Sequence, residues 1–507
     1  MRSEHSHKWL TLIAMTGSLS MIFVDQTVVS VALPRIQSDL AVSQAGLQWI
    51  VNAYVLALAV TVAFGGKLGD MFGRVRAFVA GIVVFAAASA LCGLAPNQGV
   101  IIAARVFQGL GAALMLPSSA AIVIESFDIR ERGKAMAIYV GVAQAFLALG
   151  PLLGGFLTEY LSWRWVFWIN LPVGALAILM TYISKPAGRA PGGGRVRPVY
   201  ALLLVLGMFG FVFGLQQGYE WGWSSPLTLG FLAAGLVLLE IFCFIQVKSE
   251  DPLIQLRLFR NTAFAMDNVL LFCIQFAMIS LIVFGAIYLQ TNLLFSPLKA
   301  GLAIMPIILS VVAMSQVSGR LFDRVGVKIP ALTGTFLIAL GFFSQAPFLE
   351  RGEFLMILPG MIVLGFGIGF VMVPTSTDAL NRAPSEYRGQ ASGVVQTMRQ
   401  IGATVGLASI GGLVATVQKG EVSKIISGFG GSDGVRERLA PLIDSALKGQ
   451  GDALRELSSI SPALVEDLHS AVARSISVGY YFAGSVVLAA FFLALIFMRT
   501  GRQSEDA

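Results

Sequence analysis

The sequence predicts an all-α membrane protein of fourteen transmembrane helices, arranged as two related six-helix halves with two further helices inserted between them. Three observations predict this fold class: an apolar composition, repeated apolar stretches of membrane-spanning length, and motifs that recur in the second part of the chain. The chain has 507 residues, of which 56% are hydrophobic and 12% are charged, and its mean hydropathy is +0.78. A water-soluble core does not require so apolar a composition, so the expected solvent is lipid.

The apolar stretches are each roughly 20 residues long, and at a helical rise of about 1.5 Å per residue each can cross a hydrocarbon layer of about 30 Å. The first stretch lacks a small-residue cleavage site, so we expect it to be retained as a helix. We place the spans at residues 10–33, 45–66, 76–95, 100–124, 134–157, 164–184, 199–217, 227–247, 263–291, 299–320, 329–348, 354–378, 389–416 and 476–498.

Positive charge is distributed unevenly between the two sides that these spans define. With a cytoplasmic N-terminus, the inner segments hold most of the lysine and arginine, including Lys67, Arg130 and Arg388, and the short outer loops hold almost none. Cytoplasmic loops of membrane proteins carry such an excess. We therefore expect an integral protein of the cytoplasmic (inner) membrane with both termini inside. The net charge of +7 is attributed to this bias and not to nucleic-acid binding.

An internal repeat divides the chain into two halves. Residues 66–73 (GKLGDMFG) and 319–326 (GRLFDRVG) share glycine, base, leucine, aspartate and glycine at identical spacing, 253 residues apart. A second pair of short motifs, at 117–119 and 374–376, repeats at an offset of 257. Both copies of each motif fall on the same side of the membrane, so the halves are expected to be parallel repeats related by an axis along the membrane normal.

The repeat offset is longer than six helices and their loops require, so the two spans before residue 250 are interpreted as an insertion between the halves. We expect a first half at 1–184, a linker with the two inserted helices at 185–250, and a second half at 251–507. The run of proline, glycine and arginine from Lys185 to Pro198 is typical of a linker.

A segment of about 60 residues, 417–475, would lie outside the membrane on the outer side. Its apolar residues recur at helical spacing, which favours two amphipathic helices resting on the outer membrane face or on the protein. These residues are Leu439, Leu442, Ile443, Ala446 and Leu447, followed by Leu464, Leu468 and Val472.

Four motifs carry a resemblance to a known family. The first span contains DQTVVSVALP at 25–34, the loop after the second span contains the glycine-rich motif at 66–76, RVFQGLGA lies at 105–112, and GPLLGG lies at 150–155. With these motifs the chain resembles the major facilitator superfamily, and within it the fourteen-helix drug:proton antiporter branch. The resemblance covers the chain except 417–475.

The resemblance implies an exporter and not an importer, because the motif formed by Gly150, Pro151, Gly154 and Gly155 is similar to the antiporter motif that symporters of the superfamily generally lack. Its proline would also kink the fifth span, and its glycines would form a close-contact face. The family resemblance adds that this region seals the protein against leak of protons or substrate.

Asp25 is the first candidate for a functional residue, because a carboxylate well inside a span is costly unless it serves a water-filled cavity or has a partner. Arg105 would lie at a similar depth in the fourth span and could modulate the proton affinity of Asp25. In antiport, a proton and a cationic substrate would compete for this carboxylate. The alternative is a permanent ion pair that only fixes helix packing.

The repeated motif predicts a conformational latch at the inner seam between the halves. Its glycines allow close helix approach and a tight turn, and its aspartate can accept hydrogen bonds from a helix N-terminus of the other half. Arg74 is expected to pair with Glu125 or Asp128, and Arg324 with Asp378 or Glu386. The alternative is ordinary inner-surface charge. The predicted latch comprises Gly66, Asp70, Gly73, Arg74, Glu125, Asp128, Gly319, Asp323, Arg324 and Gly326.

Arg399, Glu240 and Gln144 are secondary candidates, because they are polar residues inside predicted spans that either line a cavity or join helices. Cysteine and histidine show no spacing typical of a metal site or a hydrolase, and no phosphate-binding G-x-x-x-x-G-K-[ST] loop occurs. We therefore expect neither an enzyme nor an ATP-driven pump, and no cofactor other than a proton gradient.

These observations favour a monomeric secondary antiporter in membrane lipid that exports lipophilic, often cationic, drugs or toxic compounds by alternating access. An exporter of a lipid or of one dedicated metabolite would use the same fold. An importer or a transport-dead sensor is the less favoured alternative. The sequence does not distinguish the substrates of the first two.

Overall fold

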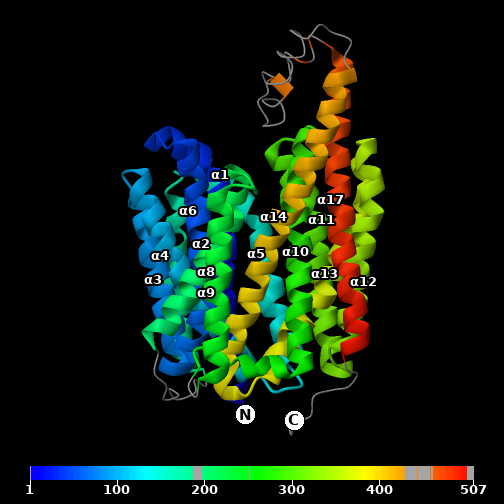
Figure 1. Cartoon of the computed structure of the whole chain (residues 1–507). Helices are drawn as coiled ribbons and strands as arrows, with labels where there is room; N and C mark the ends of the chain where they lie inside the picture. The colour runs from blue at the N-terminus through cyan, green and yellow to red at the C-terminus, as the bar shows by residue number, and fades with distance from the viewer. Residues whose placement is uncertain are drawn as a thin grey trace.

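The computed structural model describes residues 2–186, 197–249, 252–428, 442–443, 457, 459 and 461–498. In this part of the chain the regular structure is helical and contains no strand. The helices stand roughly parallel in two bundles side by side, with α5 and α14 between them (Figure 1). The sequence-based prediction of an all-helical membrane fold is confirmed.

The helices of the first part of the chain are α1 (Arg2–Leu40), α2 (Gln44–Phe72), α3 (Arg74–Leu94), α4 (Gln98–Ser126), α5 (Arg132–Tyr160), α6 (Trp165–Trp168), α7 (Asn170–Ser184), α8 (Pro198–Trp221) and α9 (Pro226–Lys248). The second part contains α10 (Thr262–Thr291), α11 (Pro297–Val325), α12 (Lys328–Gln345), α13 (Phe354–Arg382), α14 (Arg388–Gly428) and α17 (Pro462–Phe497). Three short 3-10 helices lie at η1 (Leu256–Arg260), η2 (Ala346–Arg351) and η3 (Ser385–Tyr387).

Thirteen helical segments of the described chain are long and apolar enough to cross a membrane, and α6 and α7 together form one of them. The fifth predicted span is α5, which is bent by 42° between Arg132–Leu147 and Leu149–Tyr160 and makes a fourteenth span when it is counted as one. Pro151 lies inside this helix, where it removes a backbone hydrogen bond. The number of spans therefore agrees with the prediction.

Short polar residues and glycines define several helix ends. The side chains of Ser43 and Asn97 each accept a hydrogen bond of 3.0 Å from a backbone N–H of the first turn, at the start of α2 and α4. Gly73 and Gly326, the last glycines of the two motif copies, have φ of 94° and 81°. This left-handed region favours glycine, so the tight turn predicted at both copies is present.

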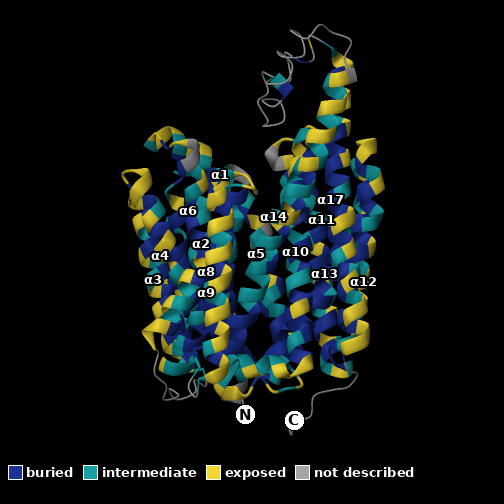
Figure 2. Ribbon diagram, in the orientation of Figure 1, coloured by how far each residue is buried: buried dark blue, intermediate teal, exposed yellow. Residues whose placement is uncertain are grey.

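Buried residues face the inside of each bundle, and exposed residues face outward (Figure 2). Many of the exposed side chains are large and apolar, for example Phe156, Leu176, Phe244 and Ile496. On a water-soluble protein so many exposed apolar side chains would be unfavourable, whereas in a bilayer they contact lipid tails.

The inserted helices α8 and α9 pack against each other through glycines, among them Gly210 and Gly235. α8 also contacts α2 and α14, and its residues Tyr200 and Leu204 belong to the same apolar core as the first helices. The inserted pair is thus placed beside the seam between the two bundles. The division of the chain at residues 184 and 250 stays a prediction.

The outer segment 417–475 differs from the prediction. Its first residues continue α14 to Gly428, and residues 462–475 form the beginning of α17, so both helices extend beyond the bundle at the end opposite the chain termini (Figure 1). Leu464 and Leu468 are buried in a small cluster with Val422 and Ile425 of α14. This apolar stripe packs on another helix, so of the two predicted alternatives, the membrane face and the protein, the structure shows packing on the protein. Most of the other predicted amphipathic helix, at 439–447, lies outside the described residues.

Candidate functional site

Asp25 of α1 and Arg105 of α4 form an ion pair in the interior of the first bundle. Asp25 is 0% exposed and Arg105 is 1% exposed, and Nη1 of Arg105 donates to Oδ2 of Asp25. The guanidinium also donates to the side chain of Gln108 and to the backbone carbonyl of Ile50, each at 2.9 Å. Its carbon lies 4.4 Å from the centre of the Tyr54 ring, a cation–π contact. Each charge is therefore enclosed and has several partners.

A polar chain continues from this pair toward α3 and α7. Gln108 donates to Oδ1 of Asp25 at 3.3 Å and lies 2.5 Å from the hydroxyl of Ser89, to which Asn170 also donates at 3.1 Å. The sequence analysis did not single out Gln108, Ser89 or Asn170 as site residues. The signal that was available is the position of Gln108 inside the motif of Arg105, and of Asn170 inside a predicted span.

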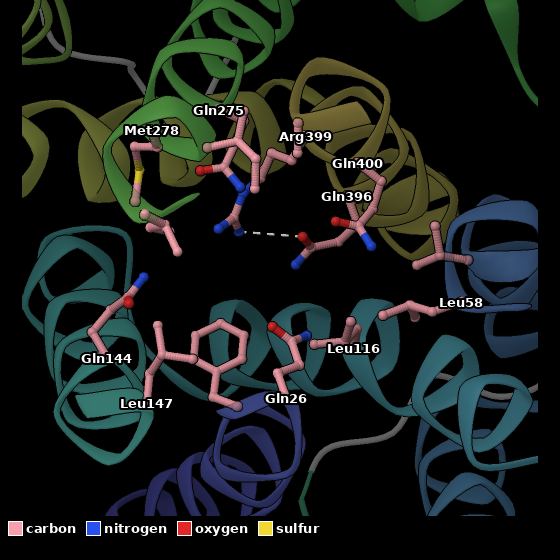
Figure 3. A pocket seen from close by; sticks show the side chains of 15 residues that line it. Gln26, Leu58, Leu116, Gln144, Leu147, Gln275, Met278, Gln396, Arg399 and Gln400 are labelled. Carbon is pink, nitrogen blue, oxygen red and sulfur yellow. Dashed lines mark hydrogen bonds between the residues drawn. The ribbon is translucent and has the colours of Figure 1, made fainter. Parts of the chain in front are cut away.

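A cavity of about 120 Å³ lies between the bundles. Its walls come from α1, α2, α4 and α5 on one side and from α10 and α14 on the other (Figure 3). Two of the secondary candidates, Arg399 and Gln144, line it, and Glu240 is exposed on α9. Asp25 does not line this cavity, although its neighbour Gln26 does. The described residues that line it are Phe23, Gln26, Leu58, Val62, Leu116, Gln144, Leu147, Gln275, Met278, Ile279, Ile282, Gln396, Arg399, Gln400 and Ala403.

A larger cavity of about 700 Å³ lies toward the outer end. It is lined by residues of α2, α8, α10, α14 and α17, and by Trp223 of the turn between α8 and α9. The two cavities are lined by consecutive residues of two helices: Ile282 and Ala403 line the central cavity, and Val283 and Thr404 line the outer one. The inserted helices thus contribute part of the wall on the outer side.

The inner end of the seam is joined through Asp70 of α2. Its two carboxylate oxygens accept hydrogen bonds from the backbone N–H groups of Gly389 (3.0 Å) and Gln390 (2.8 Å) at the start of α14. The unsatisfied N–H groups at a helix N-terminus favour a negative partner. Gly66 lies against the same place, because a Cβ atom on Gly66 would be 2.2 Å from the carbonyl oxygen of Gly389.

The second motif copy makes the equivalent contacts from the other half. Asp323 of α11 accepts hydrogen bonds from the backbone N–H groups of Gly133 (2.9 Å) and Lys134 (3.1 Å) at the start of α5. A Cβ atom on Gly319 would be 2.5 Å from the carbonyl oxygen of Gly133. Two pairs of helices, α2 with α14 and α11 with α5, are therefore held together in the same way.

Arg74 connects Asp70 to the end of α4. It donates to Asp70 at 2.7 and 3.0 Å, to Glu125, and to the backbone carbonyl of Ser385 in the other half at 2.6 Å. Of the two predicted partners, Glu125 is the one in contact, and Asp128 is exposed in the following turn. The pairing of Arg324 stays a prediction.

The glycines of α5 differ in their surroundings. A Cβ atom on Gly150 would be 1.8 Å from the hydroxyl of Thr27, and one on Gly154 would be 2.9 Å from the carbonyl oxygen of Val28, so both glycines permit close packing on α1. Gly155 has no such neighbour within 4 Å. The close-contact face predicted for this motif therefore consists of Gly150 and Gly154.

A second buried acidic group, which was not predicted from the sequence, lies at the inner end of the second bundle. Asp267 of α10 is 0% exposed, its carboxyl group lies against that of Asp378, and Nε of Arg382 is 3.9 Å away. The same Nε lies 2.5 Å from Asp378, which is 2% exposed. The rule that singled out Asp25, an acid inside an apolar span, would also have found Asp267.

With the fold and these contacts described, comparison with known proteins decides the family. The sequence matches the Major Facilitator Superfamily over residues 15–407. The chain belongs to the Major Facilitator Superfamily. As a member of the superfamily it is an integral membrane transporter and not an enzyme.

Two relatives illustrate where the chain lies in the Major Facilitator Superfamily. It is 32% identical to the tetracenomycin C resistance and export protein of Streptomyces glaucescens over 510 residues, which covers 98% of this chain and 93% of the relative. It is 34% identical to the multidrug resistance protein Stp of Mycobacterium tuberculosis H37Rv over 407 residues, 80% of this chain and 76% of the relative.

A solved structure of the superfamily has a similar fold. The proton:xylose symporter XylE superposes with a TM-score of 0.62 at 14% identity, with 98% of this chain and 97% of XylE covered. At this identity the likeness shows the fold alone.

Proposed function

We propose that this protein is a proton-coupled antiporter that exports lipophilic small molecules, including drugs and toxic compounds. The observation that carries the proposal is the central cavity between the two bundles. Gln26 of α1 lines this cavity, and the residue before it, Asp25, forms the buried ion pair with Arg105. Relatives of about one-third identity are named as resistance and export proteins, which supports export as the direction of transport.

The positions of Asp70 and Asp323 support transport by alternating access. Both Asp70 and Asp323 join the bundles at the inner end, and the larger cavity lies at the outer end. In this arrangement cargo in the central cavity is closed off from the inside. For the inner end to open, the four hydrogen bonds from backbone N–H groups to aspartate oxygens must be replaced by hydrogen bonds to water.

Proton coupling is proposed for Asp25. Protonation of its carboxylate would leave the guanidinium of Arg105 buried without its counter-charge, and breaking a buried ion pair on one side costs about 3–5 kcal/mol. The pair therefore cannot change protonation state at low cost without a rearrangement of α1 against α4. Such a requirement links proton binding to a conformational change, which is what an antiporter needs.

We also propose the cytoplasmic membrane as the location, with both termini inside, and a monomer that uses the proton gradient without a bound cofactor. The first residues of α1 and the last residues of α17 lie at the same end of the bundle, which supports termini on one side (Figure 1). The excess of lysine and arginine at this end supports the inner side.

The test of proton coupling measures collapse of a pH gradient in inside-out vesicles after addition of a lipophilic substrate. The wild type is compared with Asp25→Asn and with Asp39→Asn, a matched control at the exposed outer end of the same helix. We expect loss of the response in Asp25→Asn and an unchanged response in Asp39→Asn. An equal response in all three proteins would remove Asp25 from the mechanism, and no response in any of them would favour an exporter of a lipid or dedicated metabolite.

A further inference from the structure

The central cavity contains a positive charge that has no counter-charge. Arg399 of α14 points into the cavity from above, across from Gln26 and Gln144 (Figure 3). Its Nη1 donates to the amide oxygen of Gln396 at 3.2 Å, and its Nε is buried without a hydrogen-bond acceptor in the described chain. The amide oxygen of Gln275, on the same wall, is also buried without a partner.

Arg399 differs in this respect from Arg74 and Arg105, which are buried in the first bundle. Arg74 contacts Asp70 and Glu125, and Arg105 contacts Asp25. By contrast, none of the described residues that line the central cavity is acidic, and the nearby Asp25 is already paired with Arg105. Arg399 is half-buried, with its Nε fully buried. A cation inside a span without an acidic partner is costly, so a site of this kind favours a ligand that supplies the missing negative charge.

Other groups around Arg399 do not neutralise it. Among the described residues, Tyr139 of α5 is the titratable group that interacts electrostatically with Arg399. The Tyr139 hydroxyl shares a hydrogen bond of 2.7 Å with Ser119. The remaining polar residues of the cavity are neutral glutamines, which orient a ligand but carry no charge. The charge of the cavity is therefore positive in the state described.

We propose that the central cavity binds the acidic oxygen of a lipophilic organic anion, such as an aromatic carboxylate or an acidic phenol, with Arg399 as the recognising residue. The guanidinium offers donors in a planar fork that suits a carboxylate. The apolar side chains of Phe23, Leu58, Leu147 and Met278 enclose the ring that carries the oxygen. This inference rests on the proposed export function and narrows its cargo from lipophilic compounds in general to acidic ones.

The size of the cavity agrees with a site for one acidic ring. A cavity of about 150 Å³ holds a benzene molecule, and the central cavity has about 120 Å³. A two-ring compound such as a naphthalene derivative would place the ring that carries the acidic group beside Arg399 and extend past Ala403 and Thr404 toward the outer cavity, which has about 700 Å³.

The experiment measures binding directly and needs no transport. The purified full-length protein in detergent is titrated with 1-naphthoate and with 1-naphthylmethylamine, which carry the same ring system with opposite charges at pH 7.5. The readout is the concentration dependence of the melting temperature, since a ligand that binds the folded state raises it. We expect the anion to bind at least about 10-fold more tightly than the cation, because hydrogen bonds to a charged partner contribute this much.

Variants then assign the preference to Arg399. We expect Arg399→Gln to lower the affinity for 1-naphthoate by about 10- to 100-fold and to leave the affinity for the amine unchanged or higher, and Arg399→Lys to retain part of the preference. The control is Arg351→Gln on an exposed outer turn. If Arg399→Gln gives no cooperative melting transition, the affinities of Arg399→Lys and Gln275→Leu for 1-naphthoate are compared with that of the wild type instead.

Equal binding of the two probes, tighter binding of the amine, or unchanged naphthoate binding in Arg399→Gln would each overturn the proposal. The result is independent of the vesicle experiment, because binding can fail while proton movement persists, and proton movement can fail while naphthoate still binds. The two proposals are therefore tested separately.

Discussion

Substitution of Asp70 by asparagine tests whether the motif at residues 66–73 acts as a latch. Asp70 is almost fully buried and accepts backbone hydrogen bonds from Gly389 and Gln390 across the seam. Asparagine has one oxygen in place of two, so one of these N–H groups would face an amide NH₂ group and lose its acceptor. The other hydrogen bond would lose the assistance of the negative charge.

The size of the effect follows from the bond that is lost. A hydrogen bond to a charged group contributes about 1.5–3 kcal/mol to the state that contains it. This bond exists only when the inner end is closed, so its loss shifts the equilibrium toward the inner-open state by about 10- to 150-fold. Asp323→Asn, which acts on the equivalent contacts of Gly133 and Lys134, is expected to give a shift of similar size.

The shift is measurable as a distance distribution between spin labels on the inner ends of the two bundles. Arg76 at the start of α3 and Ile329 at the start of α12 are exposed and suit labelling, after replacement of the three free cysteines Cys92, Cys243 and Cys273. We expect a longer-distance population to grow in Asp70→Asn. If that population changes less than threefold in both Asp70→Asn and Asp323→Asn, the motif is ordinary inner-surface charge and the latch interpretation is wrong.

Three further outcomes are expected from the packing and charge of the site. Gly150→Ala should destabilise the protein by about 1–3 kcal/mol through overpacking against α1, seen as a lower melting temperature, whereas Gly155→Ala should have little effect. Asp25→Asn and Arg105→Gln should each lower the melting temperature, but the double variant should be more stable than the two losses added together, and additive losses would argue against an ion pair. Asp267→Asn should maintain or raise the melting temperature, because it removes one of two buried carboxylates that share the single guanidinium of Arg382; a large loss would show that the folded state needs the charge of Asp267.

Much of the fold could be predicted because the relevant signals are local or repeated. Apolar length alone gives the spans, and the repeat places Asp70 and Asp323 at equivalent sites without knowledge of any contact. The contact between Asp25 and Arg105 could be expected from their depths in two helices, since an unpaired charge inside a span is costly.

The rest depends on packing that a single sequence does not encode in a visible pattern. Whether a polar side chain faces a cavity, lipid or another helix is decided by helix rotation, so Gln144 and Glu240 had equal standing before the structure distinguished them. The stripe of Leu464 and Leu468 has the same periodicity whether it covers a membrane surface or a neighbouring helix. A periodic pattern shows that a face is buried but does not show what buries it.

The two latches use backbone N–H groups as their donors, and this has a consequence for mutational tolerance. Lys134 is exposed, so any residue other than proline there supplies the same N–H group, and a saturation library should accept most substitutions at this position. Gln390 supplies its N–H group in the same way, but its side chain is buried and accepts a hydrogen bond of 3.1 Å from the backbone N–H of Gln255, so fewer substitutions should be accepted there. The neighbouring glycines are different, because a Cβ atom on Gly389 would be 2.4 Å from Asp70 and one on Gly133 would be 2.4 Å from the carbonyl oxygen of Gly319. In the first half, a position that tolerates nearly every amino acid therefore directly follows one that tolerates almost none, whereas in the second half both positions are constrained.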